Sequence, residues 1–216
     1  MNLYFISGLG ADERVFKKIE LPKQFKIIHI AWPQLSTNET LQSYVSKIAL
    51  QINISEKFGL VGLSFGGMVT VELAKILKPE IAIIISSIAT VGEMPNSYQT
   101  AGRLSLNKLL PSFTLNKLYP FTYWYFGVSN HADKKLLKQI ITDTSPVFLK
   151  WAINEIIHWR NITKPQNLIH IHGTKDRLFP IKKIKADFSV EGGTHFMVYT
   201  KAAIISEIIG KILLNY

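Results

Sequence analysis

Short apolar runs recur along the chain, and several of them have no polar position at all. They cover residues 3–7, 25–30, 59–63, 81–85, 168–172 and 186–190. Strands that are apolar at every position are buried on both faces, as in a parallel sheet covered by helices. The pattern therefore predicts a mostly parallel sheet of about six strands.

Helical periodicity fills the intervals between the first runs. Apolar residues recur at positions 41, 44, 45, 48, 49 and 52, which form one face of a helix. Ser36 followed by Glu39 predicts a capping box at the start of this helix. A second helix is predicted from Phe65 to about Leu77, where Pro79 ends it. This alternation of strand and helix is typical of a doubly wound α/β sheet with right-handed crossovers.

The pattern changes between residues 90 and 161, where no strand is predicted. Helices are expected at 103–110, at 132–142 and from the Ser145-Pro146 pair onward, with serine as N-cap and proline as first residue. An aromatic cluster at 119–126 lies between the first two. We interpret the block as a helical insertion over one edge of the sheet, followed by the last two strands and a C-terminal helix.

The amino-acid composition limits the classes of protein to which the chain can belong. The chain has 216 residues, of which 47% are hydrophobic and 19% charged, as expected of one folded domain. It has no cysteine, which excludes disulfides, a thiolate nucleophile and Cys-ligated metal sites. The formal net charge is +10, but the lysines are scattered, which favours a lysine-rich surface over a nucleic-acid or membrane partner. With no signal peptide or membrane span predicted, we expect a soluble cytoplasmic protein.

The strongest chemical signal is the run Gly62-Leu63-Ser64-Phe65-Gly66-Gly67, placed between a predicted strand and a predicted helix. A serine at such a turn has strained backbone angles, and small residues on either side avoid collision with neighbouring strands. A plain tight turn would also use these residues. The strand–turn–helix context favours a nucleophile at Ser64.

A serine hydroxyl needs a base, and the chain has six histidines. Five of them lie in or beside strands, the aromatic cluster or an insertion helix and carry no further signal. His195 follows the last strand, so its loop lies at the same carboxyl edge of the sheet as Ser64. Asp176 follows the preceding strand at that edge, where it could orient the imidazole or simply form a turn.

Together with His172-Gly173-Thr174-Lys175-Asp176-Arg177 and Gly193-Thr194-His195, the Ser64 motif resembles the α/β-hydrolase superfamily, in its lid-bearing serine esterase type. The resemblance spans essentially the whole chain, with the first two strands of the family missing. It implies Ser64 as nucleophile, Asp176 as orienting acid and His195 as general base.

The same resemblance extends to two further parts of the chain. The run Ser7-Gly8-Leu9-Gly10 is similar to the family's oxyanion loop, with serine where histidine is frequent. It implies an oxyanion hole formed by the backbone N–H groups of Leu9 and Phe65. The core is then expected at 1–90 and 163–216, and a helical lid at 91–162.

These residues predict a hydrolase of carboxylic esters or thioesters with a small to medium apolar acyl group. Trp124, Tyr125 and Phe126 are expected to line the pocket or to pack the lid's own core, and Ser86 to line its floor or cap local backbone. No metal or cofactor is implied. C–C hydrolase, lyase or perhydrolase chemistry, and a non-catalytic small-molecule receptor, stay open as alternatives, as does the oligomeric state.

Overall fold

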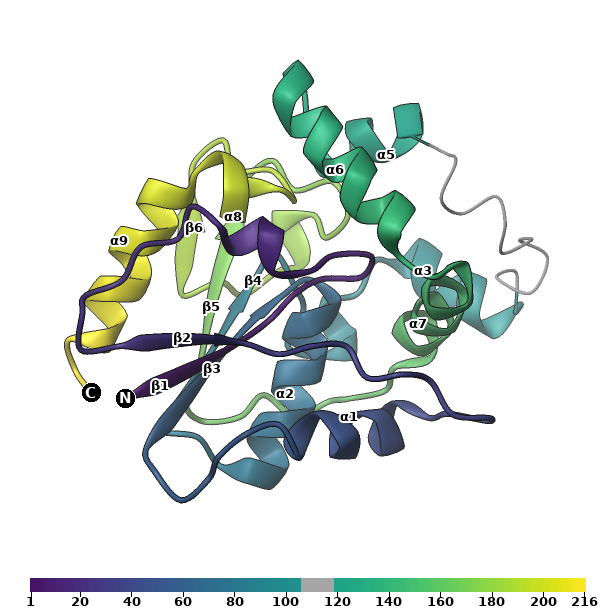
Figure 1. Cartoon of the computed structure of the whole chain (residues 1–216). Coiled ribbons are helices and arrows are strands. Elements are labelled where there is room, and N and C mark those ends of the chain that lie inside the picture. Colours follow the sequence, from purple (N-terminus) through teal and green to yellow (C-terminus); the bar gives the residue numbers. More distant parts are fainter. Residues whose placement is uncertain (106–118) are drawn as a thin grey trace.

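A six-stranded sheet runs through the middle of the molecule, shown by the computed structural model for residues 1–105 and 119–216 (Figure 1). The strands are β1 (Asn2–Ile6), β2 (Lys26–His29), β3 (Phe58–Leu63), β4 (Ile81–Ile85), β5 (Leu168–Gly173) and β6 (Phe188–Val190). Their order is β2-β1-β3-β4-β5-β6, and every neighbouring pair is parallel. The predicted sheet is therefore confirmed in strand number and direction.

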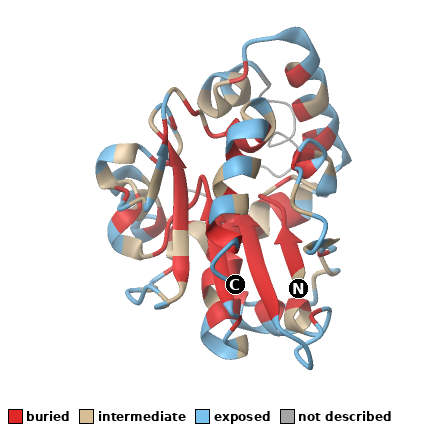
Figure 2. Cartoon of the chain, turned by 90° about the vertical axis from the view of Figure 1, so that its left-hand side faces the viewer, coloured by how far each residue is buried: buried red, intermediate tan, exposed pale blue. Residues whose placement is uncertain are grey.

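Helices cover both faces of the sheet, which explains why its central strands are apolar throughout. On one face, α1 (Leu41–Ala49) and α2 (Phe65–Leu77) share a buried core with side chains such as Leu60 and Ile84. On the other, α8 (Met197–Thr200), α9 (Ala202–Leu213) and the 3-10 helix η1 (Glu13–Phe16) share a core with Val61 and Ile83. Figure 2 shows the strands buried between helices that are exposed on their outer sides.

The chain between β4 and β5 is helical in its described parts, as predicted. It contains η2 (Val91–Glu93), α3 (Asn96–Arg103), α5 (Tyr119–Phe126), α6 (His131–Asp143) and α7 (Pro146–His158). In Figure 1, α5 and α6 lie beyond the carboxyl ends of the strands, and α7 lies beside α3. The helix expected at 103–110 is wrong at its start, because α3 ends at Arg103, and residues 106–110 lie outside the described residues. A further 3-10 helix, η4 (Ile181–Lys183), follows β5.

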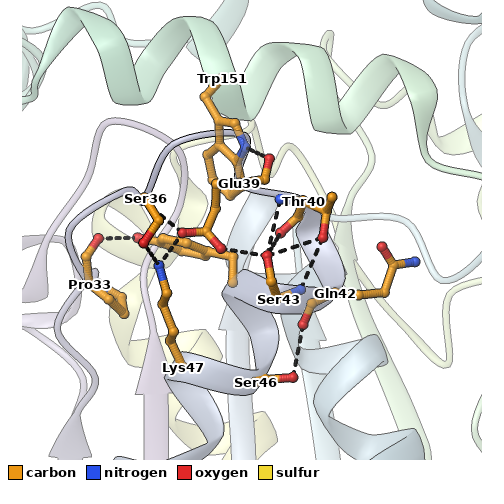
Figure 3. Close-up of polar contacts among 10 residues, drawn as sticks. Pro33, Ser36, Glu39, Thr40, Gln42, Ser43, Ser46, Lys47 and Trp151 are labelled. Atoms are coloured by element: carbon orange, nitrogen blue, oxygen red, sulfur yellow. Dashed lines mark hydrogen bonds and ion pairs between the residues drawn. The ribbon is translucent and has the colours of Figure 1, made fainter.

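The start of α1 differs from the sequence prediction. Thr40, not Ser36, is the N-cap: its hydroxyl accepts from the Ser43 N–H at 3.2 Å, and the Ser43 hydroxyl accepts from the Thr40 N–H at 3.1 Å. The Glu39 carboxylate still accepts from the Ser36 N–H at 2.9 Å, which is one of the two bonds of the predicted box, and it also pairs with Lys47 (Figure 3). The Ser36–Glu39 bond therefore lies in the loop before the helix, and the helix itself begins after Thr40.

Helix α7 is bonded to the start of α1. The Trp151 indole N–H donates to the Glu39 carbonyl at 2.9 Å, as Figure 3 shows. The Glu155 carboxylate accepts from the Leu41 N–H at 3.1 Å. The first N–H groups of a helix lack acceptors within the helix, so a carboxylate there is favourable. These two contacts attach one helix of the 91–162 segment directly to the sheet-covering layer.

The turn from β3 to α2 requires glycine. A Cβ on Gly66 would come well under 3 Å from the backbone carbonyl oxygens of Ile6 and Ser7, and one on Gly62 would collide with the Gly66 carbonyl. These neighbours are backbone atoms that cannot rotate away. The start of α2 therefore packs directly against the end of β1, and it does so because the motif has no side chains at these positions.

We expect Gly66→Ala to lower the free energy of unfolding by about 3 kcal/mol or more, because the added methyl group must push β1 and α2 apart. Gly210→Ala in α9 is the matched control, since nothing lies within 4 Å of the added Cβ. It should stabilise the chain by about 0.5–1 kcal/mol through its helix propensity. Urea unfolding followed by circular dichroism measures both, and equal stability of the two variants would contradict the close approach.

Candidate active site

Ser64 lies at the turn between β3 and α2 with φ 53° and ψ −119°, a conformation that non-glycine residues rarely adopt. Such strain persists only where the surroundings hold it. Here the Ser64 N–H donates to the Ile85 carbonyl at 2.9 Å, and the Ser87 hydroxyl donates to the Ser64 carbonyl at 2.7 Å. The end of β4 thus fixes the backbone of the predicted nucleophile on both sides.

The structure brings together the three side chains that the sequence singled out. His195 Nε2 lies 2.9 Å from the Ser64 hydroxyl oxygen, and His195 Nδ1 lies 2.8 Å from Asp176 Oδ2. Asp176 comes from the loop after β5 and His195 from the loop after β6. Both side chains are almost completely shielded from solvent. The three residues therefore form one continuous hydrogen-bonded chain across three strand ends.

The Asp176 carboxylate is held at both oxygens. Its Oδ1 accepts from the backbone N–H groups of Leu178 at 2.9 Å and Phe179 at 3.0 Å, while Oδ2 faces His195. Burial by itself raises the pKa of Asp176, but the neighbouring His195 and these hydrogen bonds outweigh it, so the pKa lies below its ordinary value. An ionised acceptor at Oδ2 places the imidazole proton on Nδ1 and leaves Nε2 free to accept from serine.

The two residues expected to supply the oxyanion hole, Leu9 and Phe65, lie near Ser64. Phe65 is the first residue of α2, so its N–H has no acceptor one turn earlier in the helix. Leu9 and Phe126 line the small cavity that Ser64 and His195 also line. A Cβ added to Gly8 would lie 3.2 Å from Ser64 Cβ, which shows how closely the loop passes the serine.

A network that the sequence reasoning missed shapes this loop. The Ser7 hydroxyl donates to the Ala11 carbonyl at 2.7 Å, and the Trp32 indole N–H lies 2.9 Å from the Ser7 hydroxyl oxygen and 3.1 Å from the Ala11 carbonyl oxygen. Ser7 stands where the resemblance expected a frequent histidine. Trp32 directly follows the second apolar run at the carboxyl edge, a position that could have singled it out.

The four residues expected at the substrate pocket lie in different places in the structure. Phe126 lines the cavity at Ser64, with its ring edge-on to His195 at 5.0 Å between centroids. Trp124 is 56% exposed and lines a different cleft, while Tyr125 packs edge-on against Trp124. Ser86 is fully buried at the end of β4 with φ 48°, and its N–H donates to the Ile171 carbonyl at 3.1 Å. Of the four, the structure brings only Phe126 to the small cavity.

The space at Ser64 is very small. The cavity that Ser64 and His195 line holds about 20 Å³ and is closed by Leu137 of α6 and by Phe126. A larger cleft of about 600 Å³ lies next to it, between the segment after β2 and the junction of α6 and α7. Ala11 lines both spaces, so the loop that follows β1 forms the partition between them.

A second imidazole lies next to Asp176. His172 Nε2 is 3.6 Å from Asp176 Oδ2 and 2.7 Å from the Phe179 carbonyl oxygen, to which it donates. That bond leaves His172 Nδ1 to accept from His170 Nε2 at 3.2 Å. Burial lowers the pKa of both rings, that of His170 to about 3. Both rings are therefore neutral near pH 7, and Asp176 is left to His195.

Comparison with solved structures finds many close matches in fold. MenH from S. aureus superposes with a TM-score of 0.78 at 15% identity, covering 100% of this chain and 94% of that one. A thermophilic esterase from Thermogutta terrifontis gives 0.73 at 16% identity, covering 100% and 90%. A bromoperoxidase from Bacillus anthracis gives 0.67 at 15% identity, covering 98% and 91%.

The chain has the α/β-hydrolase fold. No protein-family model matches the sequence, and no curated protein sequence matches it. At these identities the match concerns the α/β-hydrolase fold alone. Within the described residues, no group of three or more His, Asp or Glu side chains is placed to hold a metal ion. In the same residues, no helix has the length and apolar character needed to cross a membrane.

The buried, neutral histidines lead us to predict how the free energy of unfolding depends on pH. The folded chain keeps His170 neutral, with a pKa of about 3 against an ordinary 6.5, so the unfolded chain binds more protons below pH 6.5. Stability should therefore fall as the pH drops from about 6.5 toward 3, by about 2 kcal/mol from this residue at pH 5.

We expect His170→Gln to flatten this dependence, whatever it does to stability at pH 7. The free energy of unfolding, measured by urea titration at pH 5, 6 and 7, gives the slope. His131→Gln, at an exposed position, is the control for loss of an imidazole outside the core. A His170→Gln slope as steep as that of the unmodified chain would contradict a buried neutral ring.

Proposed function

We propose that the protein is a serine hydrolase that cleaves carboxylic esters or thioesters of small to medium apolar acyl groups. The single observation that carries the proposal is the hydrogen-bonded chain from the Ser64 hydroxyl through His195 to Asp176. This arrangement at the carboxyl edge of an α/β-hydrolase sheet supplies a nucleophile, a base and an orienting carboxylate. The solved neighbours include esterases, which agrees with this class of reaction.

The reaction follows from the geometry. Ser64 Oγ attacks the carbonyl carbon of the ester while His195 Nε2 takes the hydroxyl proton. The resulting imidazolium lies against the ionised, buried Asp176, which stabilises its charge. His195 then protonates the leaving alcohol or thiol, and the acyl group stays on Ser64. Water, deprotonated by His195, attacks the acyl carbon and releases the carboxylic acid and free Ser64.

The backbone N–H groups of Leu9 and Phe65 are proposed to hold the oxyanion. One comes from the loop after β1 and the other from the first turn of α2, where the helix dipole also favours negative charge. The Ser7 and Trp32 network supports this role, because it fixes the loop that carries Leu9. In this proposal the indole N–H of Trp32 positions the loop and takes no part in the chemical steps.

We propose that residues 91–162 act as a lid over a core formed by 1–90 and 163–216. A cavity of about 20 Å³ is too small for an acyl group, so α6 and Phe126 must shift for a substrate to enter. The adjoining cleft of about 600 Å³ offers the space, and Trp32, Leu35 and Phe148 give it an apolar wall. Opening the partition at Ala11 would join the two, which supports a small to medium apolar substrate group.

Ser64→Ala should reduce hydrolysis of p-nitrophenyl butyrate by at least about 10³-fold, because the other parts of the site cannot replace the nucleophile. The melting temperature should stay within a few degrees of the unmodified chain, since alanine fits the same turn. A fluorophosphonate reagent should label the unmodified chain at Ser64 and leave the variant unlabelled, as mass spectrometry of the peptides would show. Hydrolysis retained in Ser64→Ala would refute the proposed function.

Trp32→Phe should lower kcat by about tenfold while changing KM little, because a looser oxyanion loop stabilises the transition state less well than the bound ester. Trp159→Phe is the matched control. It also loses an indole hydrogen bond, to Glu72 at 2.8 Å, but Trp159 lines neither the cavity at Ser64 nor the adjoining cleft. Steady-state kinetics on p-nitrophenyl butyrate separate the two. An equal loss in both variants would mean that Trp32 acts only through general stability.

A further inference from the structure

A second cleft, of about 540 Å³, lies where α5 and α6 face the loops that carry Asp176 and His195. We call it the cationic cleft and define it by six of its lining residues: Tyr123, Trp124, Lys134, Lys175, Arg177 and Thr194. It shares no lining residue with the cavity at Ser64. The cleft is therefore a separate space, lined by neighbouring residues of the same loops.

Three of these residues are cations, and no acid balances them. No Asp or Glu lines the cleft among the described residues. In that part of the chain, no carboxylate lies within ion-pair distance of Lys134, Lys175 or Arg177. Like charges gathered in one concave space raise the local potential and attract an anion.

Aromatic rings hold two of the cations without neutralising them. The Arg177 guanidinium carbon lies 4.5 Å from the Trp124 ring centre, and Arg177 also donates a hydrogen bond to the Trp124 carbonyl. The Lys134 ammonium lies 5.7 Å from the Tyr123 ring centre. Cation–π contacts orient a cation but leave its charge available to a ligand. The same rings provide a flat apolar wall beside the charges.

A buried hydroxyl adds an unused hydrogen-bonding group. Thr194 Oγ1 is shielded from solvent and has no hydrogen-bond partner among the described residues. Buried polar atoms are normally paired, so an orphan in a lining residue indicates a missing partner. A rotation of the Thr194 side chain toward the cleft would let this hydroxyl donate to an oxygen of a bound anion.

We propose that the cationic cleft binds a small organic anion, in which a phosphate-type or carboxylate group is attached to a flat ring. The anionic group lies among Lys134, Lys175 and Arg177, and the ring lies against Trp124. This site does not depend on the chemistry proposed for Ser64. Its floor is nevertheless shared with the triad loops, because the Lys175 N–H donates to the Gly193 carbonyl at 2.8 Å. A bound anion therefore braces α5 against the loops of Asp176 and His195.

Isothermal titration calorimetry of the full chain at low salt tests the proposal with three ligands: phenylphosphonate, benzoate and the neutral benzamide. We expect at least one of the two anions to bind and benzamide to bind at least tenfold more weakly. Which anion binds more tightly distinguishes a phosphate-type ligand from a carboxylate. Lys175→Gln/Arg177→Gln should weaken binding by about tenfold or more, because each lost charge-assisted hydrogen bond costs several-fold in affinity.

Lys182→Gln/Lys185→Gln is the matched control, since it removes the same charge from exposed positions outside the cleft. Its affinity should stay within about twofold of the unmodified chain. If the first double variant does not fold, Lys134→Gln tests the same cleft from α6. Binding of neither anion, equal weakening by the control pair, or benzamide binding as tightly as the anions would each overturn the proposal.

Discussion

The close approach of α2 to the end of β1 is the constraint on which the rest of the site depends. It exists because Gly62 and Gly66 have no side chains where backbone atoms of the neighbouring segments lie. The turn this permits holds Ser64 at φ 53° and directs the first N–H groups of α2 toward the carboxyl edge of the sheet. Strain at one residue is thus maintained by closely packed backbone around it, together with the hydrogen bonds from Ile85 and Ser87.

Burial and its compensation set the charge states of the ionisable side chains near Ser64. Asp176, His172 and His170 are all shielded from solvent, yet they respond differently. Asp176 stays ionised because His195 and two backbone N–H groups stabilise its charge, whereas the two strand histidines have no such partner strong enough to offset desolvation. During the proposed reaction, the negative charge of Asp176 can therefore pair with the positive charge that forms on His195. The neutral rings of His170 and His172 do not compete for Asp176.

The sequence predicted the parts that depend on local pattern. Apolar runs located all six strands. Ser64, Asp176 and His195 each follow a different strand, which predicted their meeting, since carboxyl ends of parallel strands share one edge. The sequence prediction failed where contacts between distant parts of the chain determine which of two locally plausible arrangements forms. Glu39 accepts from the Ser36 N–H as expected, but Thr40 and Ser43 form the capping box, and the helix begins at Leu41. Trp124 and Phe126 are equivalent in sequence, and only packing against His195 separates them.

The helical segment is bonded to the core unevenly, which bears on how the site could open. Trp151 and Glu155 join α7 to the start of α1 through two hydrogen bonds, and the Trp151 ring packs against Tyr44 and Phe148. Arg14 joins the end of α6 through a partly exposed ion pair with Asp143. Exposed ion pairs contribute little, about 0–1 kcal/mol, and salt screens them. Helix α6 also buries Leu137, Ile140 and Ile141 in the core that it shares with Val61 and Ile83, and Leu137 lines the cavity at Ser64. A movement of α6 that admits an ester would therefore cost apolar contacts as well as the ion pair. That same movement would change the cationic cleft, which α5 and α6 also line.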